Sequence, residues 1–153
     1  MQCAKPKQQD MVRVVIDTNI WVSALLNPFG YPARLCKAFV DGRFEAVISE
    51  QLLLELADVL NRPRIKHKYG LADDDIAEFL LLLEERSEHV LLSGTVSVCR
   101  DKDDDCVLET ALRGNAQFIV SRDDDLKFDN TVSAFLANHK ISVITVAQFL
   151  ATL

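Results

Sequence analysis

The chain has 153 residues, of which 49% are hydrophobic and 26% are charged; this length and composition suit one soluble globular domain. Its 17 basic and 23 acidic residues give a net charge of −6, which argues against a generally basic nucleic-acid-binding surface. No apolar run approaches the ~18–20 residues of a membrane helix, and four scattered cysteines without a CxxC pair make zinc and disulfides unexpected.

Predicted strands and helices alternate along the chain. Residues 1–10 are polar and are expected to be flexible. They lack the apolar core of a secretory signal, so the expected location is the cytoplasm. The run MVRVVI at 11–16 is apolar and β-branched, as expected of a strand buried on both faces of a parallel sheet. The next predicted elements are helices at 19–26 and 32–41, a strand at 44–48, helices at 50–60 and 72–86, a strand at 89–92, a helix capped by Asp103 or Asp104 that runs to 113, a strand at 117–120, a helix at 132–138, a strand at 141–144 and a helix at 146–151.

This order of elements predicts an α/β fold, a three-layer α/β/α sandwich with a central parallel sheet of four to five strands. No repeat, low-complexity segment or long linker divides the sequence, so residues 11–153 are predicted to form a single domain. In open parallel sheets, ligands bind at the carboxyl ends of the strands, where the strand order reverses. Residues that directly follow a strand are therefore the first candidates for function.

Four acidic residues occupy such positions. Asp17 follows the first strand immediately, and Asp123 comes three residues after the strand at 117–120. Asp105 lies at the start of a helix. Glu55 is about two turns, or ~9 Å, into the helix at 50–60, and its side chain leans back toward the strand ends. If the strands are neighbours in the sheet, these carboxylates converge.

The acidic residues are unevenly distributed. The runs RDKDDD and RDDDLKFD together contain eight of the 23 acids, and such a cluster repels itself unless a cation is present. An oxygen-only set of ligands without His or Cys suits Mg²⁺ or Mn²⁺. The alternatives are that Asp17 and Asp105 cap helices and that residues 123–125 form a solvated turn, and the sequence leaves them open.

Four motifs in order make the chain similar to the PIN domain family. They are a hydrophobic strand that ends in Asp17-Thr18-Asn19, a Leu-x-Glu-Leu helix at 53–56, an Asp-rich helix start before an aliphatic run at 103–112, and a Ser-x-Asp-x-Asp segment after a strand at 121–125. The resemblance covers roughly residues 12–150. It departs in two places, because Ser121 replaces a frequent Thr and Leu126 replaces a frequent aromatic residue.

The resemblance implies a metal-dependent ribonuclease that uses Mg²⁺ or Mn²⁺ and cuts single-stranded or structured RNA. Its implied acidic site consists of Asp17, Glu55, Asp105 and Asp123, with Asp17, Asp105 and Asp123 as metal ligands. Asp104 and Asp125 are implied auxiliary ligands, and Asp105 is preferred to Asp104 because the aliphatic run then continues its helix in the family's manner. Asn19 and Ser121 are expected to hold carboxylates or metal-bound waters by hydrogen bonds.

The forms RDKDDD and SRDDDL are most similar to the PIN branch of toxin components in toxin–antitoxin pairs. That branch implies a small antitoxin protein as partner and a homodimer or higher oligomer. We also expect that Arg62, Arg64, Lys66 and Lys68, the one basic cluster, contact RNA phosphates, the alternative being a solvated connection between helices. Trp21 and Phe29 are expected to pack in the core or a dimer interface, with base stacking as the alternative.

Other functions are compatible with parts of this acidic pattern. A phosphatase of the haloacid-dehalogenase type also begins with an Asp after the first strand, but its second acid would be needed where this chain has Asn19. A non-catalytic PIN-like module that binds RNA or protein is the other alternative. The presence of all four acids favours the enzyme.

Overall fold

The computed structural model describes residues 11–153, except for the side chains of residues 124 and 125. The expected flexible segment 1–10 lies outside the described residues. In chain order the elements are β1 (Arg13–Ile16), α1 (Thr18–Leu26), α2 (Tyr31–Val40), β2 (Glu45–Ser49), α3 (Glu50–Leu60), α4 (Pro63–Tyr69), α5 (Asp73–Arg86), β3 (Glu88–Val90), α6 (Lys102–Arg113), β4 (Phe118–Val120), α7 (Asp124–Phe128), α8 (Asn130–Asn138), β5 (Ser142–Ile144) and α9 (Val146–Ala151).

The strands form one five-stranded sheet in the order β3-β2-β1-β4-β5, and every neighbouring pair is parallel. The chain builds outward from β1 through β2 to β3, then returns to the other side of β1 for β4 and β5. The strand order therefore reverses between β1 and β4, where Val14 aligns with Phe118 and Ile16 with Val120. A ligand site is expected at the carboxyl ends of these two strands.

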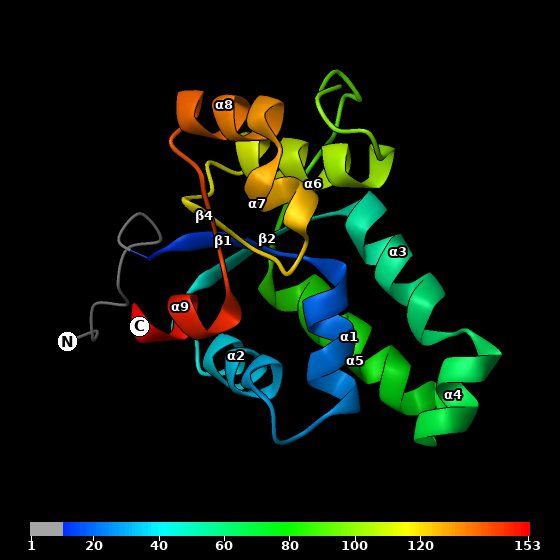
Figure 1. Cartoon of the computed structure of the whole chain (residues 1–153). Helices are drawn as coiled ribbons and strands as arrows, with labels where there is room; N and C mark the ends of the chain where they lie inside the picture. The colour runs from blue at the N-terminus through cyan, green and yellow to red at the C-terminus, as the bar shows by residue number, and fades with distance from the viewer. Residues whose placement is uncertain (1–10) are drawn as a thin grey trace.

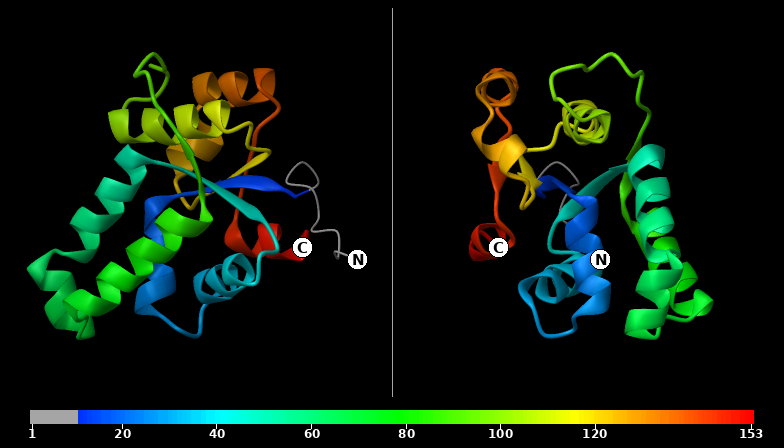
Figure 2. Two further views of the ribbon diagram at one scale, coloured as in Figure 1. Left: turned by 180° about the vertical axis from the view of Figure 1, so that it is seen from behind. Right: turned by 45° about the vertical axis from the view of Figure 1, so that its right-hand side comes forward.

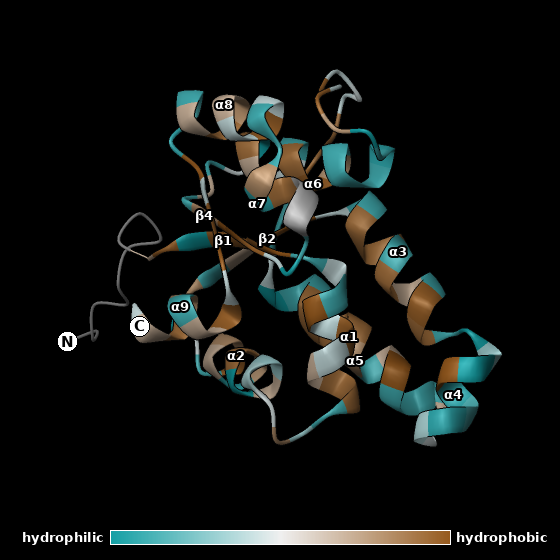
Figure 3. Ribbon diagram, viewed as in Figure 1, coloured by the Kyte–Doolittle hydropathy of each residue, from teal (hydrophilic) through white to brown (hydrophobic). Residues whose placement is uncertain are grey.

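Helices cover both faces of the sheet, so the predicted three-layer α/β/α sandwich is confirmed (Figures 1 and 2). In Figure 1, α6, α7 and α8 lie above the sheet, whereas α1, α2, α5 and α9 lie below it. Successive side chains of β1 point to opposite faces, because Val14 belongs to the lower core and Val15 to the upper core. Figure 3 shows the strands as hydrophobic ribbon between these two layers.

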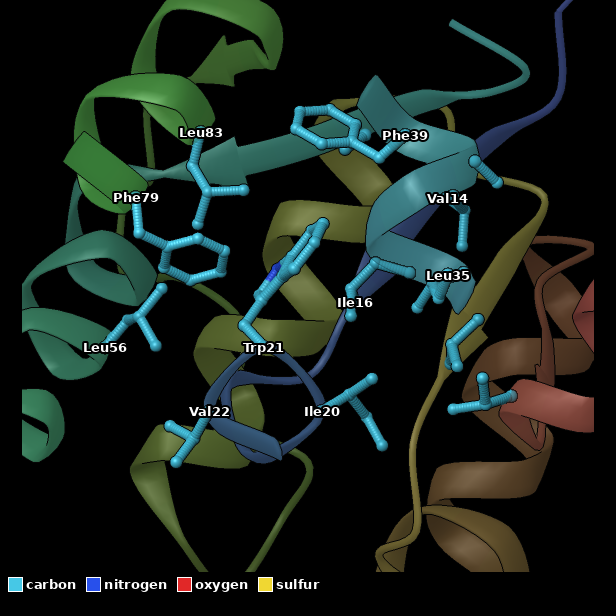
Figure 4. Packing of buried hydrophobic residues seen from close by; sticks show 14 of the residues in the cluster. Val14, Ile16, Ile20, Trp21, Val22, Leu35, Phe39, Leu56, Phe79 and Leu83 are labelled. Atoms are coloured by element: carbon cyan, nitrogen blue, oxygen red, sulfur yellow. The ribbon is translucent and has the colours of Figure 1, made fainter. Parts of the chain in front are cut away.

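The lower core contains most of the aromatic side chains. Trp21 of α1 is 4% exposed and packs edge-on against Phe39 of α2, with ring centroids 5.4 Å apart, and against Phe79 of α5, at 6.2 Å (Figure 4). Such edge-to-face contacts add to the stability that burial supplies. The core prediction for Trp21 is therefore confirmed, whereas Phe29 in the α1–α2 loop is 91% exposed and does not pack in the core.

The structure contains two helices that the sequence did not predict, α4 and α7. The basic cluster at 62–68, for which a solvated connection between helices is the alternative from the sequence, is mostly helical. Pro63 occupies the first turn of α4, and Gly70 ends this helix with φ of 62°. Asp101 is the residue that caps α6, since its side chain accepts a hydrogen bond from the Asp103 amide at 2.9 Å. The expectation that Asp103 or Asp104 caps this helix is therefore wrong. Within residues 11–153, no helix has the length and apolar character of a membrane span.

Candidate active site

Asp17 lies at the junction between the two central strands. Its backbone amide donates to the Val120 carbonyl at 3.0 Å, so the pairing of β1 with β4 continues to the edge of the site. Asp17 precedes α1 but makes no N-cap hydrogen bond with its side chain. Its carboxylate accepts a hydrogen bond from the Ser121 hydroxyl at 2.8 Å instead. The capping alternative for Asp17 is therefore not what the structure shows.

Ser121 joins the ends of the two strands. This fully buried hydroxyl donates to Asp17 and accepts a hydrogen bond from the Asp123 amide at 2.9 Å. Its two bonds fix the loop after β4 against the end of β1. Ser121 thus holds Asp17 in one orientation and brings Asp123 beside it, which is the geometry that the sequence assigned to this hydroxyl.

Asp104, from the first turn of α6, meets Asp123 across the site. Asp123 disfavours the ionised form of Asp104 both by its charge and by hydrogen bonding to the protonated form. Burial, the charge and hydrogen bond of Asp123, and the further charges of Asp101 and Asp17 raise the pKa of Asp104 to about 7. This segment of α6 therefore contributes a carboxyl group that is easily protonated near neutral pH.

Asp17 and Glu55 experience the same kind of environment. Burial raises the pKa of Asp17, while the Ser121 hydroxyl and the Thr18 amide lower it and the charge of Asp123 raises it again. Burial also raises the pKa of Glu55, and the charges of Asp103, Asp17 and Asp101 act in the same direction. The groups that perturb one another here are carboxylates, so the site carries a concentrated negative charge.

Thr18 was not singled out from the sequence, although it directly follows Asp17. Its side chain is 3% exposed, and its hydroxyl donates to Glu55 Oε2 at 3.4 Å. The contact arises because α1 packs against α3, which no local pattern reveals. Thr18 therefore links the Glu55 helix to the Asp17 strand end.

Asp105 points away from this cluster, contrary to the preference drawn from the sequence. Its carboxylate accepts hydrogen bonds from the Val98 and Cys99 amides, at 2.9 and 2.8 Å, and the residue is 8% exposed. Successive residues of a helix diverge by ~100°, so Asp104 and Asp105 cannot face the same group. In this structure Asp104 is the α6 residue at the acidic site, and Asp105 fastens the loop before α6.

The other predicted residues lie at varying distances from the cluster. Asn19 is exposed and makes no side-chain hydrogen bond with the described part of the chain. The side chain of Asp125 lies outside the described residues. The basic residues of α4 and its N-cap follow the far end of α3 (Figure 1). Two of them are paired with acids, Arg62 with Asp58 at 3.3 Å and Lys66 with Asp73.

The donor chemistry of the cluster fits a hard divalent cation. Asp17, Glu55, Asp104 and Asp123 offer only oxygen atoms, and a cation would offset the burial and the repulsion that raise the pKa values of Asp17, Glu55 and Asp104. As the described side chains stand, no three His, Cys, Asp or Glu residues are grouped closely enough to enclose a metal ion. The chemistry of the donor set therefore fits a metal, and the spacing in this conformation is not that of a closed metal cage.

Comparison with known proteins identifies the family of the chain. The family model described as PIN domain matches residues 13–125, a span that contains all four carboxylates. The Uncharacterized protein MJ1680 of Methanocaldococcus jannaschii is 30% identical over 115 residues, which cover 75% of this chain and 73% of that protein. PIN domains are generally nucleases that use divalent metal ions. The family match, the parallel sheet and the acidic cluster at its switch point agree, and the chain belongs to the PIN domain family.

Proposed function

We propose that this protein is an endoribonuclease that binds Mg²⁺ or Mn²⁺ through Asp17, Asp104 and Asp123 and uses Glu55 at the same site. The observation that carries the proposal is the buried Ser121 hydroxyl, which donates to Asp17 and accepts from the Asp123 amide and so joins the two acids at the point where the strand order reverses. Carboxyl groups that repel one another in this way cost stability, so their convergence supports a functional role.

The side chains divide the chemical work between them. A bound dication would neutralise phosphate charge, acidify a water and stabilise the leaving oxygen. Ser121 Oγ keeps the Asp17 carboxylate aimed into the site, and Thr18 Oγ1 restrains Glu55 Oε2. Because its pKa is raised, Glu55 is better suited than an ordinary carboxylate to accept a proton from the attacking water. Asp104, whose pKa is raised to about 7, would give up its proton when the cation binds.

The biological role as toxin component of a toxin–antitoxin pair is a further part of the proposal. It is supported by the RDKDDD and SRDDDL forms, which are similar to that PIN branch. A cytoplasmic location, a small antitoxin and a homodimer or higher oligomer belong to the same proposal. The test is induced expression in a bacterial host, where the parent should arrest growth and Asp17→Asn should not. Equal growth with both proteins would contradict the toxin role.

A non-catalytic PIN-like module is the second candidate, and one observation favours it: the described side chains form no closed metal cage. Such a module would bind RNA or protein without turnover. The phosphatase alternative has no support from the family match. Contact between RNA phosphates and the basic residues Arg62, Arg64, Lys66 and Lys68 is proposed for either candidate. It predicts that changing Arg64 and Lys66 to Ala weakens the salt dependence of RNA binding.

The decisive experiment is cleavage of a panel of single-stranded and structured RNA and DNA, with Mg²⁺, Mn²⁺ or EDTA. Asp17→Asn should abolish metal-dependent RNA cleavage with the fold intact. Asp74→Asn is the matched control, because Asp74 is an exposed acid at the start of α5, outside the cluster. Both variants are purified identically to expose contaminating nucleases. Cleavage by Asp17→Asn at the parent's rate would reject the assigned site, and no cleavage by the parent would favour the non-catalytic module.

A further inference from the structure

A pocket extends from the loop after β4, which carries Ser121 and Asp123, along α1 to the α1–α2 loop, and the function proposed above does not use it. Its volume is about 380 Å³, which is within the range of small-ligand sites. It opens between α1, the α1–α2 loop, the end of α4 and the loop after β4. The lining residues are Ser23, Leu26, Asn27, Gly30, Tyr31, Pro32, Tyr69 and Arg122.

Arg122 connects this pocket to the acidic cluster. It stands between Ser121, which donates to Asp17, and Asp123, whose amide is bonded to Ser121. Its own side chain lines the pocket and is exposed. On the other wall, Ser23 is six residues along α1 from Asp17, a rise of ~9 Å. A strand whose phosphate lies at the carboxylates can therefore place an adjacent nucleotide in this pocket.

Two tyrosines supply aromatic surface at the pocket. Tyr31 is 54% exposed and Tyr69 is 43% exposed. A cation lies over each ring: the Arg34 guanidinium is 5.4 Å from the Tyr31 centroid, and Lys68 Nζ is 5.3 Å from the Tyr69 centroid. Exposed aromatic rings alternating with cations are the combination that binds single strands, because rings stack on bases and cations neutralise phosphates.

Tyr31 also forms part of the wall of a neighbouring groove along α2. That groove adds Arg34, Lys37 and Arg43, all of them exposed. Within the described part of the chain, neither these three cations nor Arg122 form an ion pair with an acid. Arg62 and Lys66 of the α4 cluster, by contrast, are already paired. The groove lining includes one acid, Asp41, against three cations, so positive charge predominates from Arg122 past Tyr31 along α2, although the net charge of the chain is −6.

We infer that the Tyr31–Tyr69–Arg122 pocket holds an unpaired nucleobase of a single-stranded RNA, next to the phosphate at the acidic cluster. This inference rests on the proposed nuclease function and names its substrate class. Arg122 contacts the phosphate between the two sites, and the cations of α2 follow the backbone beyond Tyr31. A base in a regular duplex is stacked between its neighbours and cannot enter this pocket, so the site selects single strands.

The test is fluorescence anisotropy with a short labelled RNA of mixed sequence in EDTA, so that binding is measured without cleavage. Tyr31→Ala should weaken binding by ~5- to 100-fold, the loss expected for one base stack. Tyr31→Phe keeps the ring and should stay within about twofold of the parent. Arg122→Gln should weaken binding and reduce the salt slope by about one. Melting temperatures check that each variant is folded.

Matched controls and probes make the result specific. Phe128→Ala removes an exposed aromatic ring outside the pocket, and Lys140→Gln removes an exposed cation outside both the pocket and the α4 cluster. Both should bind more tightly than the pocket variants. An abasic strand should bind the parent and Tyr31→Ala equally, a duplex should bind weakly, and DNA of the same sequence shows whether the sugar matters. Equal losses in Tyr31→Ala and Phe128→Ala, or equal binding of abasic and intact RNA by the parent, would overturn the inference.

Parallel cleavage with Mn²⁺ separates the two proposals. If the parent cleaves RNA but Tyr31→Ala binds as the parent does, the base pocket is wrong and the nuclease stands. If binding depends on Tyr31 but no strand is cleaved, the nuclease is wrong and the pocket stands. If the parent neither binds a strand in EDTA nor cleaves one with Mn²⁺, both are wrong.

Discussion

Asp104 and Asp105 are neighbours in the first turn of α6, yet their carboxyl groups have opposite surroundings. Asp104 faces Asp123, Asp101 and Asp17, and its pKa is raised to about 7 by burial and by these charges. Asp105 accepts two hydrogen bonds from the Val98 and Cys99 amides. The difference teaches that the partners around an acid, and not its place in an acidic run, decide whether it serves chemistry or structure.

Glu109 extends the structural side of this comparison by one helical turn. It is 2% exposed and accepts hydrogen bonds from the Ser93 and Gly94 amides, at 2.6 and 2.9 Å, and from Arg113 at 3.4 Å. Burial raises the pKa of Glu109, but the hydrogen bonds from Ser93, Gly94 and Arg113 more than offset that effect, so its pKa is lowered overall. One side of α6 therefore fastens residues 91–101, while Asp104 faces the candidate active site.

The largest expected effect separates the two neighbours by activity. Asp104→Asn should reduce metal-dependent RNA cleavage by on the order of 100-fold or more, because it removes a carboxylate from the charged site. Asp105→Asn should retain most of the cleavage rate at a temperature where it is folded. Rates are compared at saturating Mn²⁺. The reverse ranking would restore Asp105 as the principal carboxylate and reject the comparison.

Glu109→Gln should cause the largest loss of stability. The amide removes the buried negative charge that pairs with Arg113, and its NH2 group turns a donor toward either the Ser93 amide or the Gly94 amide, since these bond to different carboxylate oxygens. We expect the free energy of unfolding to fall by about 2–4 kcal/mol. Urea unfolding measures the change, with Glu78→Gln on the exposed side of α5 as control. A loss no larger than that of the control would show that Glu109 does not fasten the loop.

Asparagine at the two neighbouring positions should change stability in opposite directions. Asp105→Asn keeps the Oδ1 oxygen that accepts from both the Val98 and the Cys99 amide but removes its negative charge, which should destabilise the protein by about 1–3 kcal/mol. Asp104→Asn relieves repulsion from Asp123 and Asp17 and should stabilise the metal-free protein by roughly 1 kcal/mol after solvent screening, or ~2–4 °C in melting temperature. Thermal melts in EDTA test both. Destabilisation by Asp104→Asn would mean that its carboxyl is held favourably.

The pH dependence of the free energy of unfolding should reflect Asp104 and Glu109 in different pH ranges, since their pKa values are shifted in opposite directions. The pKa of Asp104 is raised in the folded protein, from 3.8 to about 7, so its favourable contribution is present at low pH and is lost as pH rises through this window. The pKa of Glu109 is lowered from 4.5, so its contribution is present above that value and is lost as pH falls below it. In EDTA, stability should therefore decline from pH 5 to 8.

Asp104→Asn is the control for this last effect. It should flatten the decline between pH 5 and 8, and Glu109→Gln should flatten the acid limb. An unchanged decline in Asp104→Asn would assign the alkaline limb to other groups. Added Mn²⁺ should oppose the decline in the parent, because a cation favours the ionised carboxylates.

The sequence by itself predicted the three layers of the sandwich, and it predicted that Asp17 and the segment after β4 lie at one edge of the sheet. The β-branched run at 11–16 is apolar at successive positions, which is typical of a strand buried on both faces of a sheet. Val14 and Val15 are indeed fully buried on opposite faces. Because parallel strands end at one edge of a sheet, Asp17 and the segment after β4 had to be neighbours once β1 and β4 were adjacent. Local patterns carry this information, since they depend on periodicity and chain order.

Tertiary structure alone decided which acids face one another. The choice between Asp104 and Asp105 depends on where residues 98–99 pass over α6, and the Thr18–Glu55 contact depends on the packing of α1 against α3. The pocket likewise joins Tyr31, Tyr69 and Arg122 from segments far apart in the chain. Hydrogen bonds and charges act over a few ångströms in space, whereas a sequence pattern records only separation along the chain.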